Sequence, residues 1–527
     1  MDRQTLIAPE RYNLTSEIEK HASDPKKVAL KWQNETGEKK AITYRQLMKN
    51  VNKIGNLFRE AGLKEGDTVL VIIPRLIEAY QVYIAALKIG AVVIPSSEML
   101  KAKDLQYRIN HGNVTAVVCY KSFTGEFSGM PEAERLKLFS VGGRAEGWSD
   151  LDEQMAPMSD ELEAADTSRD DMAFLAYTSG TTGNPKGVVH THGWAFAHLH
   201  TAAENWLGIT EGDVVWATAA PGWQKWIWSP FLSVLGTGST GFVYNGRFEP
   251  RKYLSLMDEN GINVLCCTPT EYRLMAKVED LGRYKLEKIH SAVSAGEPLN
   301  QEVIETFEKH FNITVRDGYG QTENTLLLGV TRGMAVKPGS MGKPTPGNIV
   351  EIINEEGDIC GIGEVGDIAV HRDTPALFKE YLNDPERTAM QFRGDYYITG
   401  DKAKKDADGY FWFEGRADDI IISSGYTIGP FEVEDALVKH KAVKECAVVA
   451  SPDEIRGNIV KAFIVLKDGY DKKDPLLVPQ LQEHVKQLTA PYKYPRAIEF
   501  MEELPKTASG KIRRVELRKQ ELEAARQ

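Results

Sequence analysis

The sequence contains little cysteine. Its 527 residues include five cysteines, an odd number, and no two of them have the C-x-x-C spacing. This pattern argues against a disulfide framework and against the usual thiolate zinc and redox motifs. We therefore expect free thiols in a reducing compartment, with the cytoplasm as the expected location.

Long apolar runs and an excess of basic charge are also missing. No uninterrupted apolar run approaches the ~18 residues that a membrane-spanning helix needs. The polar N-terminus, MDRQTLIAPERYNLTSEIEKHASD, lacks the apolar core of a signal peptide. A net charge of −11 argues against a partner that is a nucleic acid or an anionic membrane.

Apolar strand-like runs alternate with helical patterns through the first part of the chain, which predicts an α/β fold built on parallel sheets. Short strands and glycine turns over 350–410 predict a small antiparallel unit or barrel. The remainder predicts a compact α+β domain. We place the boundary near Ala417, giving a large N-terminal domain (1–417) and a small mobile C-terminal domain (418–527).

One segment predicts a phosphate-binding loop. It runs from Tyr177 to Gly187, reads YTSGTTGNPKG and follows an apolar strand-like run, Met172 to Tyr177. Its glycines allow backbone amides to approach an anion, its hydroxyls donate to phosphate oxygens, and Lys186 supplies positive charge. The spacing differs from that of a Walker A loop. A Ser/Thr/Gly-rich surface turn is the alternative.

This segment resembles the phosphate loop of the AMP-forming acyl-CoA synthetases, which share a superfamily with peptide-synthetase adenylation domains and luciferases. Further motifs follow in the order of that family, between about Thr43 and Arg514: SAGEPL at 294–299, DGYGQTE at 317–323, YITGD at 397–401, EGRADD at 414–419 and LPKTASGKI at 504–512. The resemblance implies an ATP-dependent ligase with Mg²⁺ and coenzyme A as its other cofactors.

The resemblance assigns residues of the large domain to the nucleotide. Glu323 would hold Mg²⁺, which suits a hard carboxylate ligand, and Lys186 would join it in catalysis. Tyr319 would lie beside the adenine and Thr322 would contact phosphate. The full set of implied nucleotide residues in this domain, besides Glu323, is Thr178, Ser179, Gly180, Thr181, Thr182, Gly183, Asn184, Pro185, Lys186, Gly296, Glu297, Pro298, Asp317, Gly318, Tyr319, Gly320, Gln321, Thr322, Asp401 and Arg416.

Asp401 and Arg416 would bind the ribose, because a carboxylate accepts hydrogen bonds from two hydroxyls. Asp418 falls at the hinge of the family, although a helix cap would explain it equally well. Lys511 matches the catalytic lysine that orients the carboxylate against the α-phosphate. Acetylation of Lys511 would remove this charge, so a lysine acetyltransferase and a deacetylase are possible partners.

Residues of the last domain match positions near coenzyme A in the family. They are Ser424, Gly425, Tyr426, Arg456, Lys493 and Tyr494. For Arg456, Lys493 and Tyr494, an ordinary surface role is the alternative. Thr427 departs from the pattern, because close relatives often carry arginine there.

Six of the nine tryptophans lie between Trp194 and Trp228. They predict either an aromatic core cluster or an apolar acyl pocket that includes Trp223 and Trp226. Acetate-specific relatives carry tryptophan where this chain has Gly320. The resemblance is closest to medium-chain synthetases, so we expect a medium-chain or short branched fatty acid, with an aryl acid such as benzoate as the alternative.

Other functions fit the sequence less well. His190, His192, His198 and His200 fit no common zinc spacing on the helix we expect there. A peptide-synthetase adenylation domain would be followed by a carrier segment with its serine, which is not expected after Lys511. A luciferase-like oxygenase shares the first half-reaction, and a non-catalytic nucleotide sensor would lack Lys186, Glu323 or Lys511.

Overall fold

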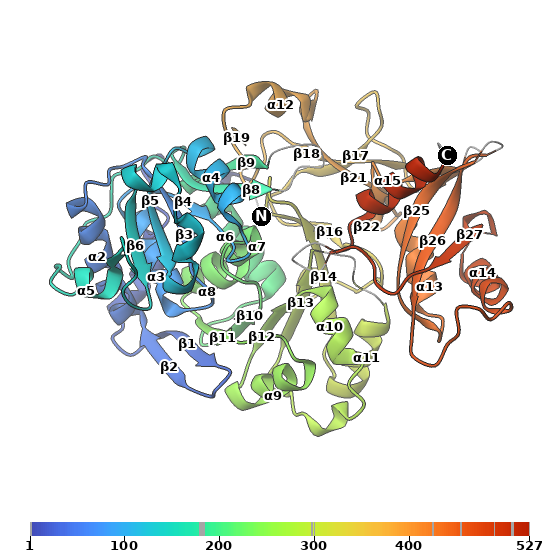
Figure 1. Ribbon diagram of the computed structural model, residues 1–527, viewed down its shortest axis with the longest axis horizontal. Coiled ribbons are helices and arrows are strands. Elements are labelled where there is room, and N and C mark those ends of the chain that lie inside the picture. Colours follow the sequence, from blue (N-terminus) through green and yellow to red (C-terminus); the bar gives the residue numbers. More distant parts are fainter. Residues whose placement is uncertain are drawn as a thin grey trace. The chain divides into compact units, whose positions relative to one another are not determined.

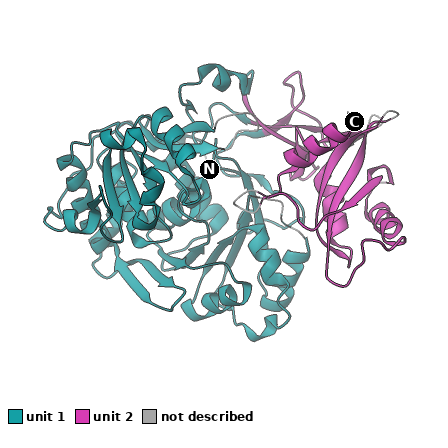
Figure 2. Ribbon diagram, in the orientation of Figure 1, with its two compact units in different colours: residues 1–350, 370–395 teal, residues 351–369, 396–527 magenta. Residues whose placement is uncertain are grey.

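The computed structural model describes residues 3–178, 185–296, 299, 301–423, 426–453, 456–489, 491–506 and 511–525. The chain forms two compact units, residues 1–350 with 370–395 and residues 351–369 with 396–527 (Figure 2). Residues 351–369 and 396–417 thus group with the C-terminal residues, and the boundary near Ala417 stays a prediction. No helix within the described ranges is both long and apolar enough to cross a membrane.

An eight-stranded sheet in the first unit carries the phosphate-loop segment (Figure 1). Its central strands are parallel, and β8 and β9 form an antiparallel hairpin beside them. In sheet order the strands are β19 (Glu380–Tyr381), β9 (Lys186–Thr191), β8 (Met172–Thr178), β4 (Val92–Pro95), β3 (Thr68–Ile72), β5 (Val114–Tyr120), β6 (Lys137–Val141) and β7 (Ser149–Asp150). Four helices accompany them: α2 (Tyr44–Glu60), α3 (Ile77–Lys88), α4 (Ala102–His111) and α5 (Leu151–Met155).

A nine-stranded sheet forms the other half of this unit. Its strands from β14 to β1 are mutually parallel, and its edges are antiparallel. In sheet order they are β16 (Lys343–Pro344), β15 (Leu326–Gly329), β14 (Val315–Gly320), β13 (Ser291–Ala295), β12 (Val264–Cys267), β10 (Val214–Ala217), β11 (Thr240–Asn245), β1 (Val28–Asn34) and β2 (Lys39–Thr43). The carboxyl ends of β13 and β14 bear the predicted nucleotide residues, as expected for an open α/β sheet.

The longer helices around this sheet alternate with its strands. They are α6 (His192–Ala202), α9 (Pro250–Asn260), α10 (Pro269–Ala276) and α11 (Gln301–Phe311), with the short α1 (Ser16–Glu19), α7 (Gln224–Trp226) and α8 (Val234–Thr237). The short α12 (Pro385–Met390) instead contacts β19 of the eight-stranded sheet. Two π-helical turns, Ala203–Leu207 and Ile227–Ser233, extend α6 and α7.

The second unit begins with the predicted antiparallel strands. β17 (Val350–Ile353), β18 (Val365–His371) and β21 (Tyr396–Lys405) follow one another in a sheet, and β22 (Phe411–Arg416) pairs with β21. A short hairpin, β23 (Ile421–Ser423) and β24 (Tyr426–Ile428), precedes the C-terminal residues.

A three-stranded sheet forms the core of these residues. Its strands are β25 (Val443–Asp453), β26 (Gly457–Leu466) and β27 (Ala497–Phe500), with helices α13 (Pro430–Val438), α14 (Leu477–Leu488) and α15 (Arg514–Ala524). Helix α13 begins at Pro430 and ends before Lys439. Proline suits the first helical turn, where its missing N–H is not needed. The α/β class with a separate C-terminal α+β part is confirmed.

An aromatic cluster joins α3 to the segment after β10. Trp226 is 1% exposed, and its ring centroid lies 4.8 Å from those of Tyr80 and Tyr83 and 5.3 Å from that of Phe231. Eleven of the twelve residues of α3 are buried, so this helix is packed on all sides. The cluster therefore contributes to the core of the first unit.

We expect Trp226→Ala to destabilise the protein by about 3–5 kcal/mol, because the truncation leaves a cavity among three aromatic rings. Trp223→Ala is the matched control, since Trp223 is 39% exposed, and should cost about 1 kcal/mol or less. Urea unfolding measures both. Equal stability of Trp226→Ala and the wild type would contradict a core role for Trp226.

Candidate functional site

The ends of the predicted phosphate loop are held together by the β8–β9 hairpin. Thr178 pairs with Lys186, and Tyr177 pairs with Gly187, in antiparallel register. Thr178 Oγ1 is buried and has no hydrogen-bond partner among the described residues. A buried hydroxyl without a partner is costly in a protein interior. It therefore fits a polar ligand at the mouth of the hairpin.

Helix α4 anchors both flanks of this loop. The Tyr107 hydroxyl donates to the Pro185 carbonyl (3.0 Å), and His111 Nδ1 is hydrogen-bonded to the Tyr177 hydroxyl (2.9 Å). The Arg108 guanidinium lies 5.2 Å from the centroid of the Tyr177 ring, as in a cation–π contact. The sequence analysis did not identify these α4 residues, because their relation to the loop exists only in the folded chain.

Lys186 and Glu323 come together in the first unit. Lys186 Nζ lies 3.6 Å from Glu323 Oε1, although the two residues are far apart in the sequence. Both groups contact a residue that the sequence analysis missed, the buried Tyr381: its hydroxyl donates to Glu323 Oε1 (2.8 Å) and accepts from Lys186 Nζ (3.1 Å). No motif quoted from the sequence included Tyr381.

The DGYGQTE segment runs from the end of β14 into the turn that carries Glu323. Burial raises the pKa of Asp317 to about 7, although the N–H groups of Gly318 and Leu299 donate to its carboxylate. Tyr319, Gly320, Gln321 and Thr322 are partly exposed beyond it. Gly296 follows β13 with φ of 112°, a conformation that favours glycine.

The backbone around Gly320 leaves little room for a side chain. A Cβ added there would lie 2.0 Å from the Thr325 carbonyl oxygen and 2.9 Å from Cη2 of Trp228. A larger residue at this position would therefore require the backbone of the turn that carries Glu323 to shift. That requirement does not depend on the size of the acid, so the role of Gly320 in admitting a longer acid stays a prediction. Trp228, its neighbour, was not among the predicted pocket residues.

Two buried histidines, His190 and His198, form hydrogen bonds to backbone carbonyls in and near the turn that carries Glu323. His190 Nε2 donates to the Thr322 carbonyl (2.6 Å), and His198 Nε2 donates to the Trp228 carbonyl (3.0 Å). Because that carbonyl can only accept, Nδ1 of His198 is the acceptor for the Thr325 hydroxyl (2.6 Å). Burial lowers the pKa of His190 to about 3 and that of His198 to about 4.

The expectation that all four histidines share a helix was wrong for His190, which lies on β9, while His192, His198 and His200 lie on α6. Strand pairing with β8 extends β9 to Thr191, whose side chain caps α6. His190 and His198 thus act as neutral hydrogen-bonding groups for the turn that carries Glu323.

The tryptophan-rich segment, residues 223–228, lies close to the end of β13. Lys225 Nζ donates to the Ala295 carbonyl at the end of β13, whereas Trp226 has the contacts of a core residue. Trp223 is half-exposed. The acyl-pocket roles of Trp223 and Trp226 stay predictions.

The second unit brings the predicted ribose residues together. Asp401 on β21 and Arg416 on β22 are direct cross-strand partners, so their side chains lie on the same face of the hairpin. Asp401 is buried and Arg416 is exposed. Asp418, the predicted hinge residue, is exposed just after β22.

The predicted coenzyme A residues lie in the C-terminal part of this unit. Tyr426 is exposed and stacks on Tyr492, with ring centroids 4.3 Å apart. Lys493 forms an ion pair with Glu432, and the Tyr494 hydroxyl accepts from Arg496 (2.9 Å). Arg456 N–H donates to Asp453 (2.8 Å). Their contacts with coenzyme A stay predictions.

Residues on either side of Lys511 contact one another in the second unit. An isolated antiparallel bridge pairs Lys506 with Ile512, and Arg513 N–H donates to the Pro505 carbonyl (2.8 Å). Lys506 also forms an ion pair with Glu445 (2.7 Å). Lys511 itself is exposed, as a catalytic or modified lysine needs to be.

Several predicted site residues lie outside the described residues. They are Ser179, Gly180, Thr181, Thr182, Gly183, Asn184, Glu297, Pro298, Ser424 and Gly425, and the side chain of Thr427 is likewise not described.

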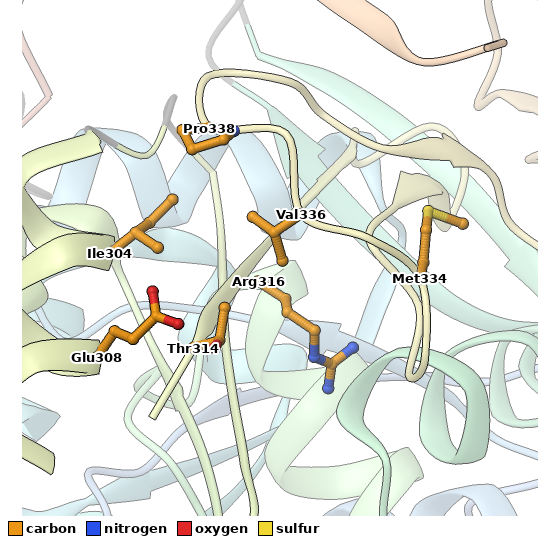
Figure 3. A pocket seen from close by; sticks show the side chains of 7 residues that line it. All are labelled: Ile304, Glu308, Thr314, Arg316, Met334, Val336 and Pro338. Atoms are coloured by element: carbon orange, nitrogen blue, oxygen red, sulfur yellow. The ribbon is translucent and has the colours of Figure 1, made fainter. Parts of the chain in front are cut away.

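A cavity of about 430 Å³ borders β14 at Arg316 (Figure 3). Ile304 and Glu308 of α11 face the loop that carries Met334, Val336 and Pro338 across it. None of the predicted site residues lines the cavity. The Arg316 guanidinium at its edge donates to the Val330 carbonyl and to Ser291 Oγ.

The donor set around Glu323 fits Mg²⁺. This ion binds through one or two carboxylates and completes its coordination with substrate phosphates and water. The described residues hold no cluster of three or more His, Cys, Asp or Glu that would form a full protein cage for a metal. A single buried carboxylate, Glu323, beside Lys186 matches this pattern.

Comparisons with known proteins show what this chain is similar to. A family model described as AMP-binding enzyme matches residues 18–382, and one described as AMP-binding enzyme C-terminal domain matches residues 432–511. The "Uncharacterized acyl–CoA ligase YtcI" of Bacillus subtilis (strain 168) is 64% identical over 99% of this chain and 98% of its own length. The mitochondrial acyl-coenzyme A synthetase ACSM3 of Mus musculus is 41% identical over 97% of this chain and 91% of its own.

Among solved structures, the anthranilate CoA ligase AuaEII in complex with anthranoyl-AMP has a TM-score of 0.91 and 29% sequence identity, and the match covers 100% of both chains.

Because His190 and His198 are buried and neutral, we expect the free energy of unfolding to fall in acid. An unfolded histidine titrates near 6.5, whereas burial lowers the pKa of His198 to about 4. Below pH 6.5 the unfolded chain therefore binds a proton that the folded chain does not, and His198 costs about 1.4 kcal/mol of stability per pH unit toward pH 4. His198→Gln keeps a donor for the Trp228 carbonyl and should reduce this dependence by about one proton.

Urea unfolding at pH 7, 6 and 5 measures the effect in the wild type and in His198→Gln. Identical pH dependence in the two proteins would contradict a buried, neutral His198.

Proposed function

Because the chain belongs to the AMP-binding enzyme family, we propose that its carboxylic acid substrate is a medium-chain or short branched fatty acid. The enzyme is an AMP-forming acyl-CoA ligase that uses ATP, Mg²⁺ and coenzyme A. The observation that carries the nucleotide chemistry is the convergence of Lys186 and Glu323, 3.6 Å apart, beside the flanks of the phosphate loop. We also propose that the enzyme is located in the cytoplasm.

In the first half-reaction, a carboxylate oxygen attacks the α-phosphorus of ATP, and the bond to the bridging oxygen of pyrophosphate breaks. Both reactants are anions, so catalysis consists of positioning and charge neutralisation. Lys186 supplies positive charge for the phosphates. Glu323 would hold Mg²⁺, which supplies further charge neutralisation for the triphosphate when bound.

Asp401 and Arg416 are proposed to hold the ribose hydroxyls, which their shared face on the β21–β22 hairpin supports. Lys511 is proposed to orient the carboxylate toward the α-phosphate. In the second half-reaction, the coenzyme A thiolate attacks the acyl carbon, and the carbon–oxygen bond to AMP breaks. We propose that the unit bearing Lys511 moves about Asp418 between the two half-reactions.

The choice of acid rests on apolar surroundings. Trp228, 7% exposed, lies against Gly320, and an indole wall suits an alkyl chain. The segment from Trp223 to Trp228 also resembles that of medium-chain synthetases. An aryl acid is the second candidate, because the anthranilate CoA ligase structure matches the whole chain.

Acid-dependent ATP–pyrophosphate exchange tests the substrate proposal. We expect butyrate, isobutyrate, methylbutyrate or hexanoate to give the highest kcat/KM, and acetate and benzoate to give lower values. Addition of coenzyme A should convert exchange into net AMP release. Highest kcat/KM with acetate would overturn the size argument, and highest kcat/KM with benzoate would establish the aryl-acid alternative.

Lys511→Ala should separate the half-reactions. We expect adenylation to fall by about 10²–10³-fold, as for loss of one charge-stabilising donor, while thioester formation from supplied acyl-AMP is largely spared. Lys506→Ala is the matched control in the same motif, because Lys506 pairs with Glu445. Stoichiometric acetylation of Lys511 should reproduce the adenylation defect. Equal loss of both half-reactions in Lys511→Ala would refute the assignment.

A further inference from the structure

Tyr381 connects the two charged residues of the proposed site through a single hydroxyl group. That hydroxyl has one proton, which it donates to Glu323 Oε1 (2.8 Å), and its lone pairs accept from Lys186 Nζ (3.1 Å). Lys186 Nζ also lies 4.5 Å from the centroid of the Tyr381 ring, within cation–π range. Because the hydroxyl has a single proton, the direction of both hydrogen bonds is fixed.

The backbone holds Tyr381 in this place from several sides. β19 pairs with β9 in antiparallel register, with Tyr381 opposite Val188, so it lies two residues along the strand from Lys186. Phe378 N–H, three residues earlier, donates to the Glu323 carbonyl (2.7 Å). Tyr381 N–H donates to Thr388 Oγ1 (3.0 Å). One short segment therefore contacts both the strand of Lys186 and the turn of Glu323.

The hydroxyl keeps the lysine and the glutamate apart. A direct charge-assisted hydrogen bond between them would bring nitrogen and oxygen to about 2.7–2.9 Å, whereas here they are 3.6 Å apart. Both contacts of the carboxylate are made by Oε1, and Oε2 has neither a hydrogen bond nor an ion pair among the described residues. The carboxylate is thus held by one oxygen, with the other available to a cation.

We propose that Tyr381 is a positioning residue for adenylation: its hydroxyl fixes Glu323 for Mg²⁺ and prevents Lys186 from pairing fully with that carboxylate. The inference rests on the proposed function, because it takes Glu323 as the Mg²⁺ ligand. Groups that hydrogen-bond to a metal ligand tune its orientation, and their loss typically costs 10–100-fold in metal affinity or activity.

Tyr381→Phe tests this role, because it retains the ring and its packing and removes only the hydroxyl. The primary readout is binding: calorimetry gives the ratio of ATP affinity in excess Mg²⁺ to ATP affinity in EDTA. We expect this ratio to fall by about tenfold or more in Tyr381→Phe. In pyrophosphate exchange, the variant should need about tenfold more Mg²⁺ for half-maximal rate, with the KM for the acid unchanged.

Two further variants make the result specific. Tyr44→Phe removes another buried tyrosine hydroxyl, one that donates to the Ser239 carbonyl (2.8 Å), and should leave the affinity ratio unchanged. Glu323→Gln should lower the ratio at least as far as Tyr381→Phe. The double variant should be no weaker than Glu323→Gln, because Tyr381 acts through that carboxylate.

The outcomes separate the inference from the proposed function. An unchanged ratio in Tyr381→Phe, with a reduced ratio in Glu323→Gln, would overturn the role of Tyr381 alone. An unchanged ratio in both would overturn the assignment of Glu323. A tenfold loss in Tyr381→Phe that extra Mg²⁺ does not rescue would indicate a general structural defect and would also overturn the inference.

Discussion

The site depends on keeping a lysine and a glutamate close together without letting them neutralise each other. Lys186 and Glu323 have opposite charges, and Coulomb attraction in a partly buried place favours direct contact. Direct contact would leave less charge for phosphate and for a cation. The Tyr381 hydroxyl between them is a neutral spacer that satisfies both partners. The β8–β9 hairpin, β19 and the turn after β14 all serve to keep these three groups in place.

Rigidity around the three groups comes from buried hydrogen bonds. His190 and His198 bond to carbonyls of the Glu323 turn and of Trp228, and helix α4 bonds to both flanks of the phosphate loop. Satisfied buried polar groups define one arrangement of the backbone, because any alternative leaves donors unpaired. Neutral imidazoles suit this purpose, since a buried charge at the same place would need a partner.

Sequence reasoning reached the residues that belong to contiguous motifs. Lys186, Glu323, Asp401 and Lys511 each stand in a run of residues whose order is informative, and the alternation of strands and helices predicted the α/β class. Apolar runs such as Val264–Cys267 form buried strands, which is the basis of that alternation. The cross-strand pairing of Asp401 with Arg416, by contrast, is known only from the structure.

Sequence reasoning could not find Tyr381, Tyr107 or His111. Each acts through a contact between segments that are distant in the chain, and none belongs to a run with its own signature. Tyr381 reaches Lys186 and Glu323 because β19 pairs with β9. A strand of only two residues is too short for its pairing to be predicted from the sequence. The histidines present a different case: their spacing fits no common zinc pattern, and the structure shows His190 and His198 bonded to the Thr322 and Trp228 carbonyls.

Gly320 shows how a backbone turn can restrict the evolution of specificity. A side chain at this position would meet the Thr325 carbonyl oxygen at 2.0 Å, so a single codon change cannot simply add a bulky wall there. The turn would first have to be rebuilt, and that turn carries Glu323. The shape of this turn and any acid preference that position 320 controls are therefore coupled through the same backbone.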